Sequence, residues 1–247
     1  MEIKTPIVSI LVPTRNRTNK LKISLDNLFE TCYNEYNFEV LCGVDNDDFE
    51  TIHFLNDYIV NHPQVKYFLF EKGGYKNVYK IQNYLVSQAS GHFIFPYADD
   101  SEILSYNWDL VLKEYNNKFL VFNPLIKSLK HYVRNIDPNI PGYVWFGYPI
   151  FPKKLVDITG RVSNNTATDS WISELVYNAQ IPYIQEDNII IEHYRFDETK
   201  NEDDIDPLYY EVVNDRNFVS SDFHSEYQIQ ERIKDIEKLK SYIKSFG

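Results

Sequence analysis

Glycine, cysteine and methionine are scarce in this chain, and long apolar runs are missing from it. The 247 residues include 8 Gly, 2 Cys and 1 Met. Cys32 and Cys42 form no C-x-x-C pair and no disulfide framework, which argues against a disulfide-stapled secreted scaffold and fits a reducing compartment. The apolar run Ile7–Val12 is too short for a signal-peptide core, and no run approaches the roughly 20 apolar residues of a membrane-spanning helix. The sequence therefore predicts a cytoplasmic protein without a transmembrane segment.

Basic residues are outnumbered by acidic ones. The chain has 25 Lys and Arg against 36 Asp and Glu, which gives a net charge of −11 at pH 7. A partner such as duplex nucleic acid demands a basic face, so this class of partner is excluded. A single nucleotide stays compatible, because a metal ion and one or two arginines neutralise its few charges. Tyrosine is abundant, with 20 residues, and its apolar ring with a polar tip suits grooves for sugars and bases as well as protein cores.

Short apolar segments recur through the first half at the spacing of βαβ units. The expected strands are Ile7–Val12, Phe38–Val44, Val65–Phe70 and His92–Pro96. Helical periodicity fills the gaps between them, on three apolar stripes: Leu21, Leu25, Leu28, Phe29 and Cys32; Ile52, Leu55 and Ile59; Val78, Ile81, Leu85 and Ala89. Thr18 is the expected cap of the first helix. The pattern predicts an α/β fold with an open, mostly parallel sheet flanked by helices.

The second half of the chain has a less regular apolar periodicity, which gives weaker support to the elements predicted there. The expected strands are Lys118–Asn123, Tyr143–Pro152 and Ile189–Ile191, and one helix is marked by Ile172, Leu175, Val176 and Ala179. The acidic stretch Asp197–Asp206 predicts a solvated or mobile loop. A C-terminal amphipathic helix is marked by Ile229, Ile233, Ile236, Leu239 and Ile243. We expect this helix to pack back on one compact domain, the alternative being a partner or membrane surface.

A polar cluster follows each of the first four expected strands. The clusters are Pro13–Arg17, Asp45–Asp48, Glu71–Gly74 and Asp99–Asp100. Ligands of open α/β sheets bind beyond the carboxyl ends of the strands, so the clusters favour a site there, although each one alone is compatible with an ordinary loop. The cluster after the first strand has no glycine, which disfavours a dinucleotide fingerprint or a Walker A loop. Phosphates would then be met by arginine side chains or by a metal ion.

Asp99 and Asp100 place two like charges side by side directly after an apolar strand. Such a pair needs either a turn open to solvent or a cation that binds both carboxylates. Aspartate oxygens are suitable ligands for Mg²⁺ or Mn²⁺, and a divalent cation reverses the local electrostatics. The pair is therefore a candidate metal site, with the charged turn as its alternative.

Four motifs together resemble the nucleotide-sugar domain of family 2 GT-A glycosyltransferases. They are VSILVPTRNR, GVDNDD, NYLVSQASGHFIFPYADD and NWD, which span about residues 6–110 in consistent order and spacing. TDSWISEL and IIIEHYRFDE add a weaker match further along the chain. Two positions depart from the family pattern, since Arg15 stands in place of the usual aromatic residue and the 46–48 turn is not made of small residues. The resemblance implies a single GT-A-like domain over 1–247, with a nucleotide-sugar half at about 1–125, an acceptor half at about 126–220 and the C-terminal helix at about 221–247.

The resemblance also implies roles for individual residues. The implied nucleotide-sugar-binding residues are Pro13, Thr14, Arg15, Arg17, Asp45 and Asp99, with Asp45 on the base. The implied ligands of Mn²⁺ or Mg²⁺ are Asp99, Asp100 and His193. Asp169 would be the catalytic general base, and Trp108 and Asp109 would lie near the acceptor. The residues alone leave alternatives open: an Asx turn for Asp45, a helix N-cap for Asp169 and a strand-end histidine for His193.

The function that this resemblance implies is sugar transfer from a nucleoside diphosphate sugar, with a UDP-sugar favoured, to a glycan or another hydroxyl acceptor. A general base opposite a leaving nucleotide implies inversion at the anomeric carbon, and the 197–206 loop is a candidate lid. One alternative is a sugar nucleotidyltransferase, although PTRNRTNK lacks the glycine-rich basic loop expected after its first strand. The other is a catalytically idle module that binds a nucleotide sugar or a glycan.

Overall fold

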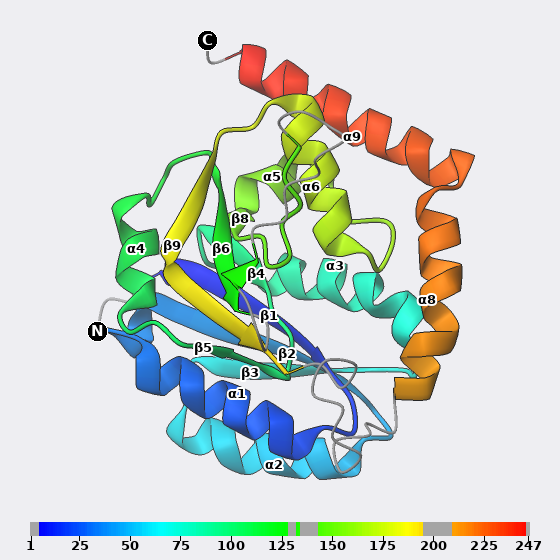
Figure 1. Ribbon diagram of the computed structural model, residues 1–247. Coiled ribbons are helices and arrows are strands. Elements are labelled where there is room, and N and C mark those ends of the chain that lie inside the picture. Colours follow the sequence, from blue (N-terminus) through cyan, green and yellow to red (C-terminus); the bar gives the residue numbers. More distant parts are fainter. Residues whose placement is uncertain (1–4, 128–131, 134–142, 195–208, 246–247) are drawn as a thin grey trace.

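The first half of the chain alternates strand and helix, as its apolar pattern predicts (Figure 1). The computed structural model describes residues 5–127, 132–133, 143–194 and 209–245. The alternating elements are β1 (Val8–Thr14), α1 (Thr18–Thr31), β2 (Phe38–Asp45), α2 (Phe49–Asn61), β3 (Val65–Phe70), α3 (Val78–Gln88) and β4 (Phe93–Pro96). Short 3₁₀ turns, η1 (Glu35–Asn37) and η2 (Tyr75–Asn77), precede β2 and α3. The four strands and three helices predicted for this half are confirmed.

The main sheet has the strand order β3-β2-β1-β4-β8. Its first four strands are parallel, and the short β8 (Phe151–Pro152) pairs antiparallel with β4. In the centre of the sheet Val8 is in register with Phe38 on one side and Phe93 on the other. The carboxyl ends of β1, β2, β3 and β4 therefore meet at one edge, and the predicted mostly parallel α/β architecture is confirmed.

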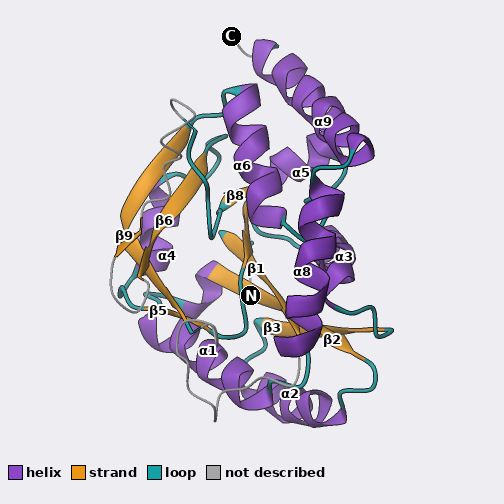
Figure 2. Cartoon of the chain, turned by 45° about the vertical axis from the view of Figure 1, so that its right-hand side comes forward, coloured by secondary structure: helices purple, strands orange, loops and turns teal. Residues whose placement is uncertain are grey.

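Helices cover both faces of this sheet and create two apolar clusters. Val8 and Ile10 of β1 pack in the cluster that contains the buried leucines of α1 and α2, such as Leu25 and Leu55. The intervening Leu11 points to the other cluster, which α3 completes together with α5 (Lys153–Thr159), α6 (Thr168–Ala179) and α9 (Glu226–Lys244). Figure 2 shows α1 and α2 together below the sheet, while α3, α6, α8 (Tyr209–Phe223) and α9 lie on its other side. Strands buried on both faces explain why their sequences are continuously apolar.

A second sheet, with the order β5-β9-β6-β7, stands beside the first. Its strands are β5 (Ser101–Ile103), β6 (Val121–Lys127), β7 (Tyr132–Val133) and β9 (Tyr183–His193). The predicted strand at 118–123 thus begins later and runs further, and the one at 189–191 belongs to a strand of 11 residues. The predicted strand Tyr143–Pro152 is mostly wrong, because its described residues form only β8 and two isolated bridge positions, at Val144 and at Ile150 opposite Phe122. Pro149 and Pro152 cannot donate to a strand ladder, which limits pairing in this stretch.

The remaining helices lie in the second half of the chain. They are α4 (Trp108–Glu114), α5 (Lys153–Thr159), α6 (Thr168–Ala179), α8 (Tyr209–Phe223) and α9 (Glu226–Lys244). The pattern predicts α6 and α9 correctly but gives no sign of α8. The predicted cap Thr18 is wrong, since Arg17 is the N-cap of α1 without a side-chain bond and Thr18 Oγ1 lies 2.9 Å from Thr51 Oγ1. The acidic stretch 197–206, with its lid hypothesis, lies outside the described residues.

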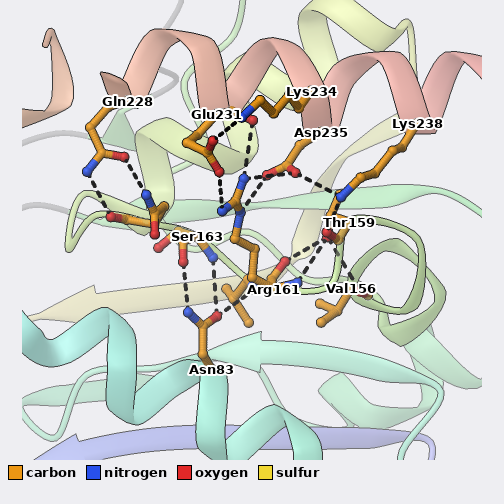
Figure 3. A network of polar contacts seen from close by, with 12 residues as sticks. Asn83, Val156, Thr159, Arg161, Ser163, Gln228, Glu231, Lys234, Asp235 and Lys238 are labelled. Atoms are coloured by element: carbon orange, nitrogen blue, oxygen red, sulfur yellow. Dashed lines mark hydrogen bonds and ion pairs between the residues drawn. The ribbon is translucent and has the colours of Figure 1, made fainter. Parts of the chain in front are cut away.

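The C-terminal helix α9 buries only part of its predicted apolar stripe, since Ile236 and Leu239 are buried in the second apolar cluster. Ile229 and Ile233 are each 39% exposed, whereas Asp235 is fully buried. Figure 3 shows the reason: Arg161, from the segment between α5 and α6, reaches Asp235 and Glu231 on α9. The helix packs on the domain as predicted, but an ion network on its inner face takes the place of part of the expected apolar stripe. Among the described helices, none combines the length and the apolar character needed to cross a membrane.

Candidate functional site

The carboxyl ends of β1 and β4 bring Thr14, Arg17 and Asp99 together. Thr14 Oγ1 donates to Asp99 Oδ2 at 2.7 Å, and Arg17 Nη1 donates to Asp99 Oδ1 at 2.8 Å. Both oxygens of a carboxylate that is only 3% exposed therefore accept a hydrogen bond. The end of β1 and the residue that caps α1 hold Asp99 in one orientation.

Asp100 joins the same cluster through a histidine from the second sheet. His193 Nε2 lies 3.0 Å from Asp100 Oδ1, and Arg17 Nη1 lies 3.4 Å from Asp100 Oδ2. The antiparallel pairing of β5 with β9 sets Ser101 opposite His193, and Tyr194 N donates to the Asp100 carbonyl at 2.9 Å. The second sheet thus brings a histidine that is distant in sequence onto the aspartate pair.

The two aspartates respond differently to their surroundings. Burial raises the pKa of Asp99, and the positive charge of Arg17 offsets only part of this effect. Burial also raises the pKa of Asp100, but the hydrogen bond and the charge of His193 outweigh it, so that the pKa lies below its ordinary value. The adjacent carboxylates are therefore distinct groups, and Asp100 is the one that stays ionised most readily.

The donor set fits a divalent metal on one side of the pair. Asp100 and His193 offer carboxylate oxygen and imidazole nitrogen at a common point, and Mn²⁺ accepts both kinds of donor. Asp99 already engages Thr14 and Arg17 through its two oxygens. Across the segments that the structure describes, no group of three or more His, Cys, Asp or Glu side chains is arranged to hold a metal ion. A metal here would take its other ligands from a bound phosphate or from water.

The next strand end, that of β2, carries a second ionic cluster. Arg15 Nη1 donates to Asp45 Oδ2 at 2.7 Å, and Arg15 Nη2 donates to Asp47 Oδ2 at 3.0 Å. Hydrogen bonds from Arg15 to Asp47 and Asp45 raise the pKa of the guanidinium above its ordinary value, although burial opposes them. Asp48 accepts from Asn16 N at 2.6 Å and caps α2, which fixes the two loops to each other. The predicted residues Arg15 and Asp45 are thus adjacent.

Pro13 belongs to the same part of the sheet, but within a strand. It pairs with Gly43 in the ladder between β1 and β2, one residue before Thr14. Pro13 therefore lies within β1 next to the side chains of the two clusters.

Asp169 occupies the first turn of α6 and is not its N-cap. The N-cap is Ala167, whereas Asp169 Oδ1 accepts from Ser170 N at 2.7 Å. Just before the helix, Thr166 Oγ1 donates to the carbonyl of Tyr75, in the η2 turn that follows β3. Since β3 ends at the same edge as β1, β2 and β4, the start of α6 lies at the side of the sheet that carries the two clusters.

Residues that the sequence analysis did not single out hold the loop before α6. Asn83 of α3 accepts from Val162 N at 2.7 Å and donates to the Ser163 carbonyl at 2.8 Å. Asn165 Nδ2 donates to Asp222 Oδ2 at 2.7 Å, which ties the loop to α8. The run of Ser, Asn and Thr in RVSNNTATDS was the available signal, because these residues satisfy irregular backbone with their side chains.

Trp108 and Asp109 do not lie where the resemblance implies. Both side chains are fully buried. Asp109 accepts from Tyr33 N at 2.6 Å and from Asn37 Nδ2 at 2.7 Å, next to the amino end of β2. The expected position near the acceptor is therefore wrong, since this pair fastens α4 at the opposite edge of the sheet.

Comparisons with known proteins identify the fold. No family model matches the chain, and no curated protein matches it. Solved structures do match it. Staphylococcus aureus TarS 1-349 in complex with UDP-GlcNAc has a TM-score of 0.59 and 16% identity, over 95% of this chain and 73% of that one. The mannosyltransferase PcManGT from Pyrobaculum calidifontis, in complex with GDP-Man and Mn²⁺, has a TM-score of 0.55 and 12% identity, over 94% of this chain and 74% of that one.

The matches differ in how much of the other chain they cover. The chain covers 59% of TarS 1-349 in complex with UDP, at a TM-score of 0.57 and 17% identity, and 42% of the longer TarS chain. Identities at this level establish the fold alone. The predicted GT-A-like architecture of nucleotide-sugar transferases is confirmed.

Proposed function

We propose that the chain transfers a sugar from a nucleoside diphosphate sugar to a hydroxyl group of a glycan or another acceptor. One observation carries this proposal: Asp99, Asp100, Arg17 and His193 converge at the carboxyl end of β1 and β4. Open α/β sheets bind ligands at this edge. Solved structures with the same fold are complexes with UDP-GlcNAc and with GDP-Man and Mn²⁺.

The cluster is suited to the diphosphate part of such a donor. Asp100 and His193 would hold Mn²⁺ or Mg²⁺, which supplies Lewis-acid stabilisation of the negative charge on the leaving diphosphate. Arg17 adds a permanent positive charge beside them. Asp99 holds Arg17 in place by accepting its hydrogen bond. When Arg17 turns toward the phosphates of the donor, this oxygen of Asp99 would become a further metal ligand. Thr14 holds Asp99 in the orientation that this requires.

Asp169 is the proposed general base. Its carboxylate begins α6 at the side of the sheet that carries the clusters, and the side chain is only half-buried, which leaves it accessible to an acceptor hydroxyl. Removal of the hydroxyl proton as the sugar is attacked opposite the diphosphate inverts the anomeric carbon. A dense set of hydrogen bonds before α6 fixes the helix start, as expected for a base that must act at one position.

A sugar nucleotidyltransferase is the less favoured alternative. Such an enzyme is expected to carry a glycine-rich basic loop after its first strand, and PTRNRTNK contains no glycine. A catalytically idle binding module is distinguished by experiment, since it binds the donor without turnover.

The test measures release of nucleoside diphosphate with Mn²⁺ over a panel of donor sugars. We expect His193→Gln and Asp100→Asn each to reduce the metal-dependent turnover, while Asp157→Asn, on an exposed helix turn, serves as the control. Asp169→Asn should lower turnover by roughly 10²–10⁴-fold with donor binding retained. Equal loss of donor binding and turnover in Asp169→Asn would assign this residue a structural role, and donor binding without any turnover in the wild type would establish the binding module.

A further inference from the structure

One of the three tryptophans of the chain lies outside both apolar clusters. Trp108 and Trp171 are fully buried, the first in the cluster with α1 and α2 and the second in the cluster with α3 and α6. Trp145 is only half-buried, and neither cluster of the described residues includes it. An indole is a large apolar side chain, and leaving part of it in water forgoes the hydrophobic free energy of core packing. Core packing therefore does not account for Trp145.

The indole of Trp145 is nevertheless held at two opposite ends. At the pyrrole end, Nε1 donates to Ser170 Oγ of α6 at 3.3 Å. At the benzene end, Cζ3 and Cη2 lie against Gly147, where an added Cβ would be 3.0 and 3.1 Å from these two atoms. The same Cβ would collide with Ile126 Cδ1 of β6, so the glycine lets the indole and the strand approach each other closely. These contacts fix the position of an aromatic ring that the core does not use.

The segment that carries Trp145 connects the start of α6 with the cluster of aspartates and histidine. Trp145 bonds to Ser170, in the first turn of α6. Three residues along the chain, the hydroxyl oxygen of Tyr148 lies 2.6 Å from Ser101 Oγ. The ring of Tyr148 packs edge-on against the imidazole of His193, with 5.5 Å between the ring centroids. The indole therefore belongs to a short segment that lies against the candidate site at both ends.

The contact at Ser170 also sets the indole beside the proposed general base. Ser170 Oγ accepts from Trp145, and Ser170 N donates to Asp169 Oδ1 at 2.7 Å. Asp169 and Trp145 are both half-buried. Under the proposed function, on which this inference rests, Asp169 takes the proton of the acceptor hydroxyl, whereas the diphosphate of the donor binds at Asp100. A molecule that covers the indole next to Ser170 would then be the acceptor.

The chemistry of an indole identifies the kind of acceptor. A pyranose ring has C–H groups that form an apolar face and hydroxyl groups at its rim. An aromatic side chain packs on that face and leaves the hydroxyls free to react, whereas an open-chain polyol has the hydroxyls without a fixed apolar face. We propose that Trp145 is the binding platform for a sugar ring of the acceptor, which makes the acceptor a saccharide.

The first experiment measures tryptophan fluorescence of the full chain with Mn²⁺ and either UDP or GDP. Because Trp108 and Trp171 are fully buried, Trp145 should account for the fluorescence that acrylamide quenches, and Trp145→Phe should lose this component. The probes are the methyl pyranosides of glucose, galactose, mannose and N-acetylglucosamine, with sorbitol as the open-chain control. We expect at least one pyranoside to protect the wild type from quenching and sorbitol to give no protection. Protection by none of the pyranosides, or equal protection by sorbitol, would overturn the inference.

The second experiment measures transfer kinetics with the protecting pyranoside as the acceptor. Trp145→Ala should raise the KM for the acceptor roughly 5- to 30-fold, the scale of one lost aromatic contact, and leave the KM for the donor within about twofold. Gly147→Ala keeps the indole but displaces it, so it should raise the acceptor KM by a smaller factor. The control is Tyr106→Ala, which removes an aromatic side chain that is 75% exposed, just before α4 at the opposite edge of the sheet, and both constants should stay unchanged.

The outcomes separate this inference from the proposed function. Turnover with an unchanged acceptor KM in Trp145→Ala, or with an equal rise in the donor KM, would overturn the inference and leave the transferase function intact. Protection of Trp145 by a pyranoside without turnover of any donor would support the saccharide site and overturn the transfer reaction. The quenching of the wild type needs no variant, so it tests the platform even where Trp145→Ala fails to fold.

Discussion

The strongest stability prediction concerns the ion pair that fastens α9 to the rest of the domain. Arg161 Nε donates to Asp235 Oδ2 at 2.9 Å and Nη2 donates to Oδ1 at 3.1 Å, which is a bidentate pair (Figure 3). The carboxylate is fully buried. Its other cationic neighbour, Lys238, lies at 3.7 Å. Arg161→Met would therefore leave a buried charge with one distant counter-charge, and removal of one partner from such a pair costs about 3–5 kcal/mol.

Replacing both Arg161 and Asp235 by apolar residues should cost much less stability than replacing Arg161 alone. Burial raises the pKa of Asp235 above its ordinary value even though Arg161 opposes this effect. A carboxyl group with a raised folded-state pKa favours folding at low pH and loses that contribution as the pH rises through this pKa. At neutral pH the charged Asp235 is thus a net cost that Arg161 offsets only in part. We expect Arg161→Met/Asp235→Leu to recover most of the stability that the single variant loses.

The assay is urea unfolding at neutral pH, with the midpoint and slope fitted for each variant. The single variant should also lower the thermal midpoint by about 6–20 °C, at roughly 2–4 °C per kcal/mol for a chain of this size. The control is Lys234→Met, which removes a cation that pairs with Glu231 on the same helix and is 62% exposed, and it should cost less than about 1 kcal/mol. A single variant as stable as this control, or a double variant no better than the single one, would refute the reasoning.

Two predictions concern the amino edge of the sheet. Burial raises the pKa of Glu39, but hydrogen bonds from Ser90 and Ser9 outweigh it and hold the pKa below its ordinary value of 4.5. A depressed folded-state pKa contributes stability above the unfolded pKa that is lost as the pH falls through the folded one, so Glu39→Gln should destabilise most near neutral pH and least in acid. A destabilisation that stays constant in a urea titration from neutral to acid pH would contradict this. Gly91→Ala would set a Cβ 2.6 Å from Ser9 N, and this clash should lower the free energy of unfolding by about 1–3 kcal/mol; an unchanged thermal midpoint would contradict it.

The main sheet was predictable because its strands are buried on both faces and recur at βαβ spacing. The second sheet was not, and β9 gives the reason. Its sequence YIQEDNIIIEH places the polar run Gln185–Asn188 in mid-strand, and such residues are depleted in strands. The ladder to β6 shifts register between Pro124 and Leu125, so the pairing follows no regular alternation. Periodicity finds only the three isoleucines of this strand.

The candidate site likewise has one part that the sequence predicts and one part that it does not. Asp99 and Asp100 can be recognised from the local sequence alone, because two adjacent carboxylates follow an apolar strand. Their partnership with His193 depends on the antiparallel pairing of β5 with β9, which the sequence does not express. In α9 the inner face holds Asp235 because Arg161 satisfies it, and an apolar pattern cannot reveal a buried charge whose partner lies 74 residues away.

Under the proposed function, the charges at the carboxyl edge explain why the donor and a cation would bind there together. Arg15 engages Asp45 and Asp47, and Arg17 engages Asp99 and Asp100. A diphosphate would bring further negative charge to these arginines. It would therefore compete with the aspartate carboxylates for the same guanidinium donors. A divalent cation at Asp100 removes part of that competition, because it neutralises the aspartate and attracts the phosphates at the same time. Under the proposed function, the edge would therefore bind a metal ion and a nucleoside diphosphate as one unit.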